Sequence, residues 1–114
     1  AQSGLEQARI AMDAAAKEVD AARARLTAMQ SRLREVEANL TRSRRDVERL
    51  KGLLAKDEVS QQQYDAAVAA ADAQGAAADA VRAQIAEAEA GVRMSESRQA
   101  QAAAGEQAAR AGLR

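Results

Sequence analysis

The sequence contains no proline, cysteine, histidine, tryptophan or phenylalanine, and Tyr64 is its only aromatic residue. Aromatic side chains supply much of the buried area of a compact core, so a globular domain is not expected. The absence of cysteine and histidine removes the thiol nucleophile, the commonest general base and the commonest transition-metal ligands. Acidic pairs such as Glu87 and Glu89 are two residues apart, on different faces of a helix. We therefore expect no enzyme, no cofactor and no metal site.

Charge and hydropathy further limit the classes of function that we expect. The chain carries 17 basic and 17 acidic residues, a formal net charge of zero. Because nucleic-acid-binding domains present a large basic excess, we expect no nucleic-acid partner. No apolar run approaches the roughly 20 residues that a membrane-spanning helix needs.

Alanine dominates what is present, followed by arginine, glutamine, glutamate and leucine, a mixture typical of long helices. In the first half, every seventh residue is apolar: Leu5, Met12, Val19, Leu26, Leu33, Leu40, Val47 and Leu54. A second series follows three residues later: Ala8, Ala15, Ala22, Met29, Val36, Ser43 and Leu50. Together they form the a/d seam of a coiled coil, sustained for over seven heptads.

The second half carries a thinner seam of smaller residues. One series reads Tyr64, Ala71, Ala78, Ile85, Val92 and Gln99, and the other Ala67, Gln74, Val81, Ala88, Ser95 and Ala102. A fold-back near residue 57 places Leu50 by Tyr64, Val47 near Ala67, Leu33 by Val81 and Met29 by Ile85. The pattern predicts an all-α fold, a long antiparallel two-helix coiled-coil hairpin.

We expect one hairpin domain over residues 1–114. Helix one is predicted at about 2–55, the tip turn at about 56–59 and helix two at about 60–111. Neither end carries a helix start or stop signal, so we expect a part excised from a larger protein. Beyond Gln99 the seam turns polar, with Glu106 the next member of its series, which predicts fraying at the open end.

The predicted tip lies in the stretch RLKGLLAKDEVSQQQYD, residues 49–65. Ser60 and Gln63 have the spacing of a capping box, and Val59 and Tyr64 that of a hydrophobic staple. Leu53 lies outside the seam, and Arg49 precedes it by one helical turn. An exposed leucine beside an arginine at the end of a helical pair suggests a docking surface, although the same residues would also serve a plain turn.

The spacing of Arg49, Leu53 and Ser60 resembles the Arg-Leu-Ser tip motif of the periplasmic adaptor proteins, or membrane fusion proteins, of the hemolysin-D-like superfamily. The text RLKGLLAKDEVSQQQYDAA and the alanine-rich arms are similar to theirs as well. In that family the hairpin is inserted into a lipoyl-like β-domain, which this chain lacks together with the other β segments. The resemblance therefore covers the hairpin alone.

The resemblance implies a role in a tripartite efflux or secretion system of a Gram-negative bacterium. The hairpin would span the periplasm in a parent protein anchored at the inner membrane. Its tip would dock on a TolC-like outer-membrane channel, and the parent, commonly a ring of six, would meet an inner-membrane transporter through the missing domains. The tip contacts implied are Arg49, Leu53 and Ser60, with Lys56, Val59 and Tyr64 as further candidates.

Two charged stripes off the seams predict lateral packing between neighbouring hairpins, or an ordinary solvated face. They are Arg42, Arg45 and Arg49 in the first half, and Asp65, Asp72 and Asp79 in the second.

Two other functions stay open. The chain could be a structural coiled-coil spacer arm of another assembly. An amphipathic lipid-binding helical protein is a weaker alternative, because the apolar face is narrow and lacks tryptophan and phenylalanine.

Overall fold

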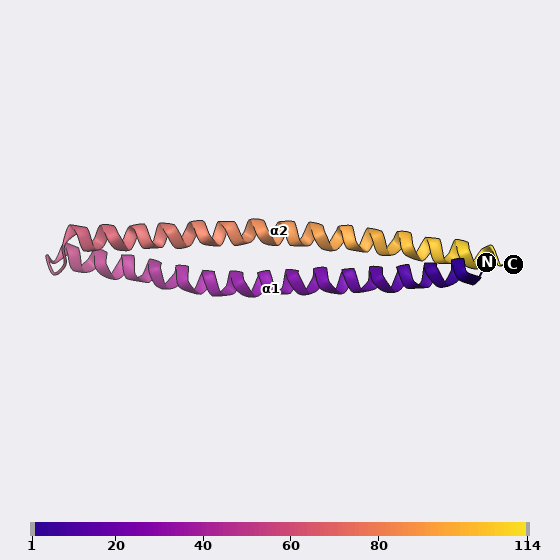
Figure 1. The fold of residues 1–114 in the computed structure, drawn as a ribbon. Helices are drawn as coiled ribbons and strands as arrows, with labels where there is room; N and C mark the ends of the chain where they lie inside the picture. The colour runs from indigo at the N-terminus through magenta and orange to yellow at the C-terminus, as the bar shows by residue number, and fades with distance from the viewer. Residues whose placement is uncertain (1, 114) are drawn as a thin grey trace. The chain divides into compact units, whose positions relative to one another are not determined.

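A computed structural model describes residues 2–113 as two helices joined by a short turn (Figure 1). Helix α1 spans Gln2–Ala55 and helix α2 spans Gln61–Ala111. No strand occurs within residues 2–113. The predicted all-α, antiparallel two-helix hairpin is confirmed. Neither helix has a stretch apolar enough to cross a membrane, over the residues described.

The contacts within the chain divide it into two compact units, each built from one segment of α1 and one segment of α2. Unit 1 comprises Ala1–Ala28 and Ala86–Arg114, and unit 2 comprises Met29–Ile85. Unit 2 contains the turn, so it is itself a helical hairpin. Each unit is therefore a two-helix pair with its own buried residues.

Unit 2 has a core in which large side chains of α1 meet small ones of α2. Val36, Leu40, Ala78 and Val81 are buried, and Leu33 and Ile85 pack against them. Leu33 and Val81 thus belong to one cluster, as the predicted register requires. Ala78 has no exposed surface at all, because its small side chain lets the two backbones approach closely.

Unit 1 follows the same packing scheme with a thinner core. Ala15, Val19 and Ala88 are buried, and Val19 is only 2% exposed. Ion pairs cross between the helices at its surface, from Arg23 to Glu96 at 3.0 Å and from Arg98 to Glu18 at 3.9 Å. All four side chains are about half exposed, so these pairs contribute little stability compared with burial.

The polar end of the seam is helical. Helix α2 continues through Gln99 and Glu106 to Ala111. Glu106 is buried at 6% exposure, and its Oε1 lies 2.7 Å from the guanidinium of Arg110, one turn later. A buried carboxylate costs free energy unless it is paired, and Arg110 supplies the partner. The polar seam position is therefore accommodated within the helix.

Truncating Leu40 to alanine should destabilise the protein strongly, because Leu40 is 5% exposed within the core of unit 2. We expect a loss of about 2–3 kcal/mol from the lost transfer free energy and the residual cavity. Urea denaturation followed by circular dichroism at 222 nm measures this loss.

The matched control is Ile10→Ala, because Ile10 is a large aliphatic residue that is 68% exposed. Its free energy of unfolding should change by less than about 0.5 kcal/mol. Equal losses in the two variants would contradict the assignment of the core.

Candidate docking tip

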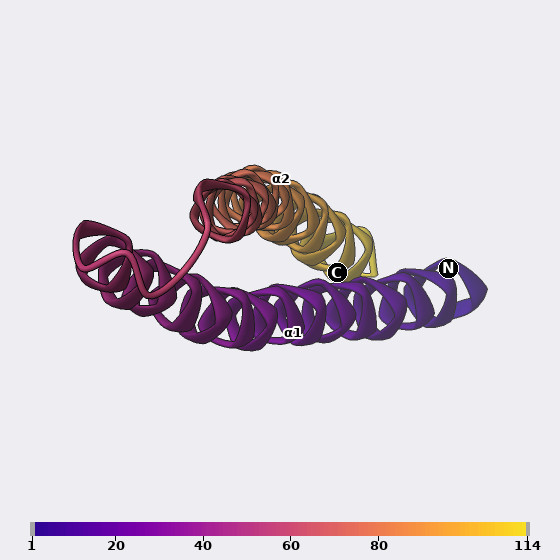
Figure 2. The ribbon, with the colours of Figure 1, turned by 90° about the vertical axis from the view of Figure 1, so that its left-hand side faces the viewer.

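The tip is the segment from the last turns of α1 to the first turn of α2, residues 49–65. Figure 2 looks onto this end of the chain and shows the connection passing from α1 across to α2. Only five residues, 56–60, lie outside the two helices here. A turn this short is held in place by the hydrogen bonds at its two ends.

Three backbone hydrogen bonds close the end of α1. The Glu58 amide donates to the Leu53 carbonyl at 2.9 Å, and the Asp57 amide donates to the Leu54 carbonyl at 3.0 Å. Lys56 N also donates to the Leu53 carbonyl, at 3.1 Å. The first two bonds form a Schellman motif, which needs a left-handed residue just after the helix. Asp57 is that residue, with φ of 56°.

A reciprocal pair of hydrogen bonds opens α2. The Gln63 amide donates to Ser60 Oγ at 3.1 Å, and the Ser60 amide donates to Gln63 Oε1 at 2.8 Å. The capping box predicted from the sequence is confirmed. The first helical hydrogen bond follows, from the Tyr64 amide to the Ser60 carbonyl at 3.2 Å. The Ser60 hydroxyl oxygen is therefore engaged as an acceptor, while its hydrogen remains able to donate.

The structure corrects the expected exposure of Leu53. We predicted an exposed leucine, but its side chain is half-buried. The reason is its position one turn before the point where the chain reverses, so the turn folds back beside it. Arg49, by contrast, is 62% exposed, and its only ion pair in the described chain is with Asp46 at 3.4 Å. The tip thus carries an exposed guanidinium one helical turn before a partly covered apolar side chain.

The further tip candidates fall into two groups. Lys56 and Ser60 are exposed. Val59 and Tyr64 are half-buried, in the positions before and after the cap that a hydrophobic staple occupies. Lys56 is thus accessible to a partner, whereas Val59 and Tyr64 are partly covered.

The residues of the two predicted lateral stripes are exposed, and several are already engaged on their own helices. Arg42 donates to Asn39 Oδ1 at 3.0 Å, and Asp65 accepts from Gln61 Nε2 at 2.9 Å. Asp79 pairs with Arg82 at 3.0 Å.

Arg82 is a residue that the sequence analysis did not single out. Besides its contact with Asp79, its guanidinium lies 3.2 Å from Glu37 on α1. One arginine therefore links an aspartate of the predicted stripe to the opposite helix of unit 2.

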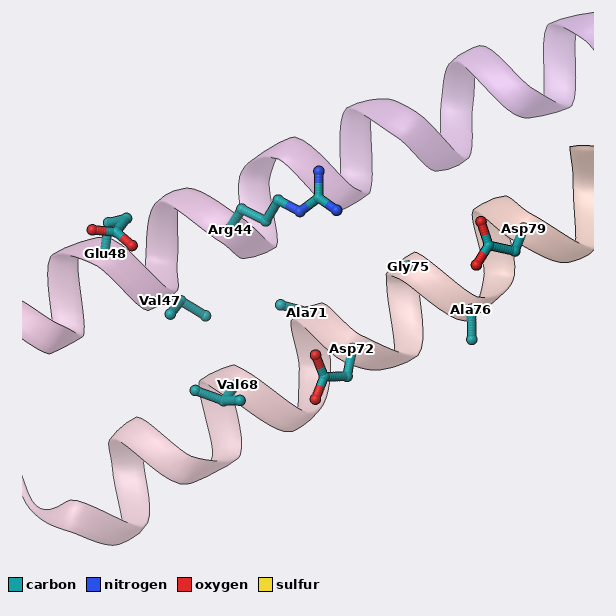
Figure 3. A pocket seen from close by; sticks show the side chains of 9 residues that line it. All are labelled: Arg44, Val47, Glu48, Val68, Ala71, Asp72, Gly75, Ala76 and Asp79. Carbon is teal, nitrogen blue, oxygen red and sulfur yellow. The ribbon is translucent and has the colours of Figure 1, made fainter.

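A shallow groove of about 570 Å³ runs between the two helices of unit 2 (Figure 3). Asp72 and Asp79 line it from α2, and Arg44 and Glu48 line it from α1. The sequence analysis assigned the basic stripe to Arg42, Arg45 and Arg49 and missed Arg44. Residue numbers on facing positions add up to about 114, which places Arg44 close to the level of Asp72. This register gives the level along the helices but not the side on which each residue lies.

No cluster of acidic residues suited to a metal ion occurs within residues 2–113. No protein-family model, no curated protein and no solved structure matches the chain.

The left-handed conformation of Asp57 makes a specific prediction for stability. A β-branched residue is strained at positive φ, so Asp57→Val should destabilise the hairpin by about 1–2 kcal/mol. Asp57→Gly should stabilise it by up to about 1 kcal/mol, because glycine adopts this conformation without steric cost. Urea denaturation of the two variants measures the free energy of unfolding and tests both the expected loss and the expected gain.

Lys56→Val is the control for this experiment, since Lys56 is an exposed neighbour without positive φ. It should cost clearly less than Asp57→Val. If valine were tolerated equally at both positions, the Schellman closure would not hold the turn in solution.

Removing the cap of α2 should loosen the tip without unfolding the helices. Ser60→Ala deletes the oxygen that accepts from the Gln63 amide, at an expected cost of about 1 kcal/mol. Ser60→Asp should retain most of that stability, because aspartate is an equally good cap.

The measurement is amide hydrogen exchange at Gln63, together with urea denaturation. Gln62→Ala provides the comparison, since Gln62 is exposed and lies beside the capping box. Unchanged protection of the Gln63 amide in Ser60→Ala would show that water replaces the cap at no cost.

Proposed function

We propose that this chain is the α-helical hairpin of a periplasmic adaptor protein, part of a tripartite efflux or secretion system. Its tip would dock on the periplasmic end of a TolC-like outer-membrane channel. The parent protein would assemble with copies of itself and meet an inner-membrane transporter through domains outside this chain. The hairpin itself would act as a spacer and contact element, with no covalent chemistry.

The observation that carries this proposal is the arrangement of Arg49, Leu53 and Ser60 about one short, hydrogen-bonded turn. The carbonyl of Leu53 accepts two of the three bonds that close α1, and Ser60 provides the cap that opens α2. Two of the three residues of the proposed motif, Leu53 and Ser60, therefore also shape the turn. A preformed turn binds with a smaller loss of conformational entropy than a flexible loop.

Each of the three residues offers a different contact. The planar guanidinium of Arg49 can donate to carboxylates or carbonyls of the channel. Its present partner, Asp46, belongs to an exposed pair at 3.4 Å, and such a pair costs little to exchange. The uncovered part of Leu53 suits an apolar groove between channel helices. Ser60 contributes its small size and one hydroxyl hydrogen.

Docking can be tested with a single photo-crosslinker. The chain has no cysteine, so Leu53→Cys introduces a unique thiol for a benzophenone maleimide. With a purified TolC-like channel in detergent, we expect an ultraviolet-dependent cross-link to the periplasmic end of the channel. Arg49→Asp in the same chain should reduce its yield at least about tenfold, because a charge that attracts the channel is replaced by its opposite.

Two controls separate docking from accidental contact. The same label at Ile10→Cys, an exposed residue far along the sequence, should give no cross-link to the channel. Circular dichroism should show that Arg49→Asp leaves the helices intact. If the label at residue 53 captured no TolC-like channel, or captured it regardless of Arg49→Asp, the chain would instead be a spacer arm with an inert tip.

A further inference from the structure

The three methionines of the chain differ in their exposure to solvent. Met12 and Met29 belong to the seam of α1 and are half-buried. Met94, on the α2 segment of unit 1, is 57% exposed. Because oxidants attack a methionine sulfur that solvent reaches, the thioether of Met94 is the one most open to chemical modification.

The space around Met94 stays open because the preceding turn of α2 carries only small side chains. Side chains of a helix point toward its N-terminus, so that of Met94 leans toward the turn that contains Ala90 and Gly91. A methyl group at Gly91 would meet no side chain within 4 Å. All three residues line a shallow groove of about 540 Å³ in unit 1. A small oxidant can therefore approach Met94 from the groove.

The sulfur of Met94 lies against a cation. Arg98 follows one helical turn later, and its Nη2 donates to Met94 Sδ at 3.5 Å. A thioether is a weak acceptor, so this hydrogen bond is weak. The other terminal nitrogen, Nη1, lies 3.9 Å from Glu18 Oε2, a distance too long for a hydrogen bond. Arg98 thus directs a donor at Met94 without finding a strong acceptor there.

Oxidation of the sulfur by a hydroperoxide supplies that acceptor. The sulfur lone pair attacks one peroxide oxygen, so that an S–O bond forms and the O–O bond breaks. With hydrogen peroxide, the transferred oxygen passes its proton to the departing hydroxide, and the products are a sulfoxide and water. Sulfur loses two electrons and the peroxide gains them. The new oxygen extends from a sulfur that already lies 3.5 Å from Arg98 Nη2, within reach of a charge-assisted hydrogen bond.

We propose that Met94 is a site of reversible oxidation by hydroperoxides, and that Arg98 binds the sulfoxide oxygen. Oxidation changes the exposed edge of the groove in unit 1 from apolar to polar. The two helices stay paired, because Met94 lies outside both seams. At Met12 or Met29 the same reaction would place a polar group in the seam and disturb its packing. The structure therefore favours oxidation at a position where the fold tolerates it.

This site does not depend on the proposed docking to a channel. Met94 and Arg98 belong to unit 1, whereas the docking tip belongs to unit 2. Failure of the channel cross-link would leave the expected oxidation of Met94 unchanged. Equal oxidation of all three methionines would in turn leave the tip contact intact.

Peptide mapping after treatment with hydrogen peroxide tests the selectivity. Trypsin releases the three methionines in separate peptides, residues 10–17, 26–32 and 94–98, because lysine or arginine bounds each of them. In the folded chain Met94 should be oxidised at least about fivefold faster than Met12 or Met29. In concentrated urea the three rates should converge, since unfolding exposes every sulfur. Equal rates in the folded chain would overturn the proposal.

The role of Arg98 is tested in a chain with Met12→Leu and Met29→Leu, where Met94 is the only thioether. Nitrogen-15 NMR of the arginine side chains measures how fast the guanidinium protons exchange with water. Oxidation should slow this exchange at Arg98 at least about threefold, because its protons become bonded to the sulfoxide. Arg93, an exposed neighbour of Met94, is the internal control and should not change. Sulfoxide reductases acting on both epimers should restore the original rate.

Urea denaturation of the same chain gives an independent measurement. Oxidation should lower the equilibrium constant for unfolding about two- to threefold relative to its effect in Arg98→Gln, because a side-chain bond between positions one turn apart stabilises α2. Arg93→Gln is the matched control and should respond as the parent chain does. Unchanged proton exchange at Arg98, or an equal response in Arg98→Gln, would show that water alone solvates the sulfoxide, and would overturn the assignment of Arg98.

Discussion

The fold depends on one steric arrangement, the packing of large aliphatic side chains of α1 against alanine on α2. In unit 2, Leu40 and Val36 fill the space that the small side chain of Ala78 leaves free, and Ala78 is completely buried as a result. Most helical stability in proteins comes from packing an apolar face, and this contact provides that packing for both helices. Everything else in the structure, including the position of the tip, follows from that pairing.

The tip shows how few residues are needed to reverse the chain when each backbone group finds a partner. Helix ends leave carbonyls and amides without intrahelical bonds. At the end of α1 the Leu53 carbonyl accepts two amides, and at the start of α2 Ser60 and Gln63 satisfy each other. Asp57 adopts the left-handed backbone conformation that the reversal of the chain requires. A turn built in this way holds the side chains on either side of it in a fixed relation, which is what a contact surface requires.

A fold of only two helices leaves the seam between them incompletely covered. Two helices bury only the sides that face each other, so Val47 and Ala71 stay half-buried beside the groove of unit 2. Ion pairs between the helices, such as Arg82 with Glu37, are exposed. They favour the correct pairing of the two helices more than they add to its stability.

The sequence by itself determined the two helices, their fold-back and the capping box of Ser60 and Gln63, because periodicity and caps depend on residues a few positions apart. It also indicated the approximate register, since bulky residues have to meet. Only the tertiary structure decided that Leu53 is half covered, that Asp57 takes the left-handed position, and that Arg44 shares a groove with the aspartates of α2. Those features depend on how far each helix is rotated about its axis and on the path of the turn, which no local pattern specifies.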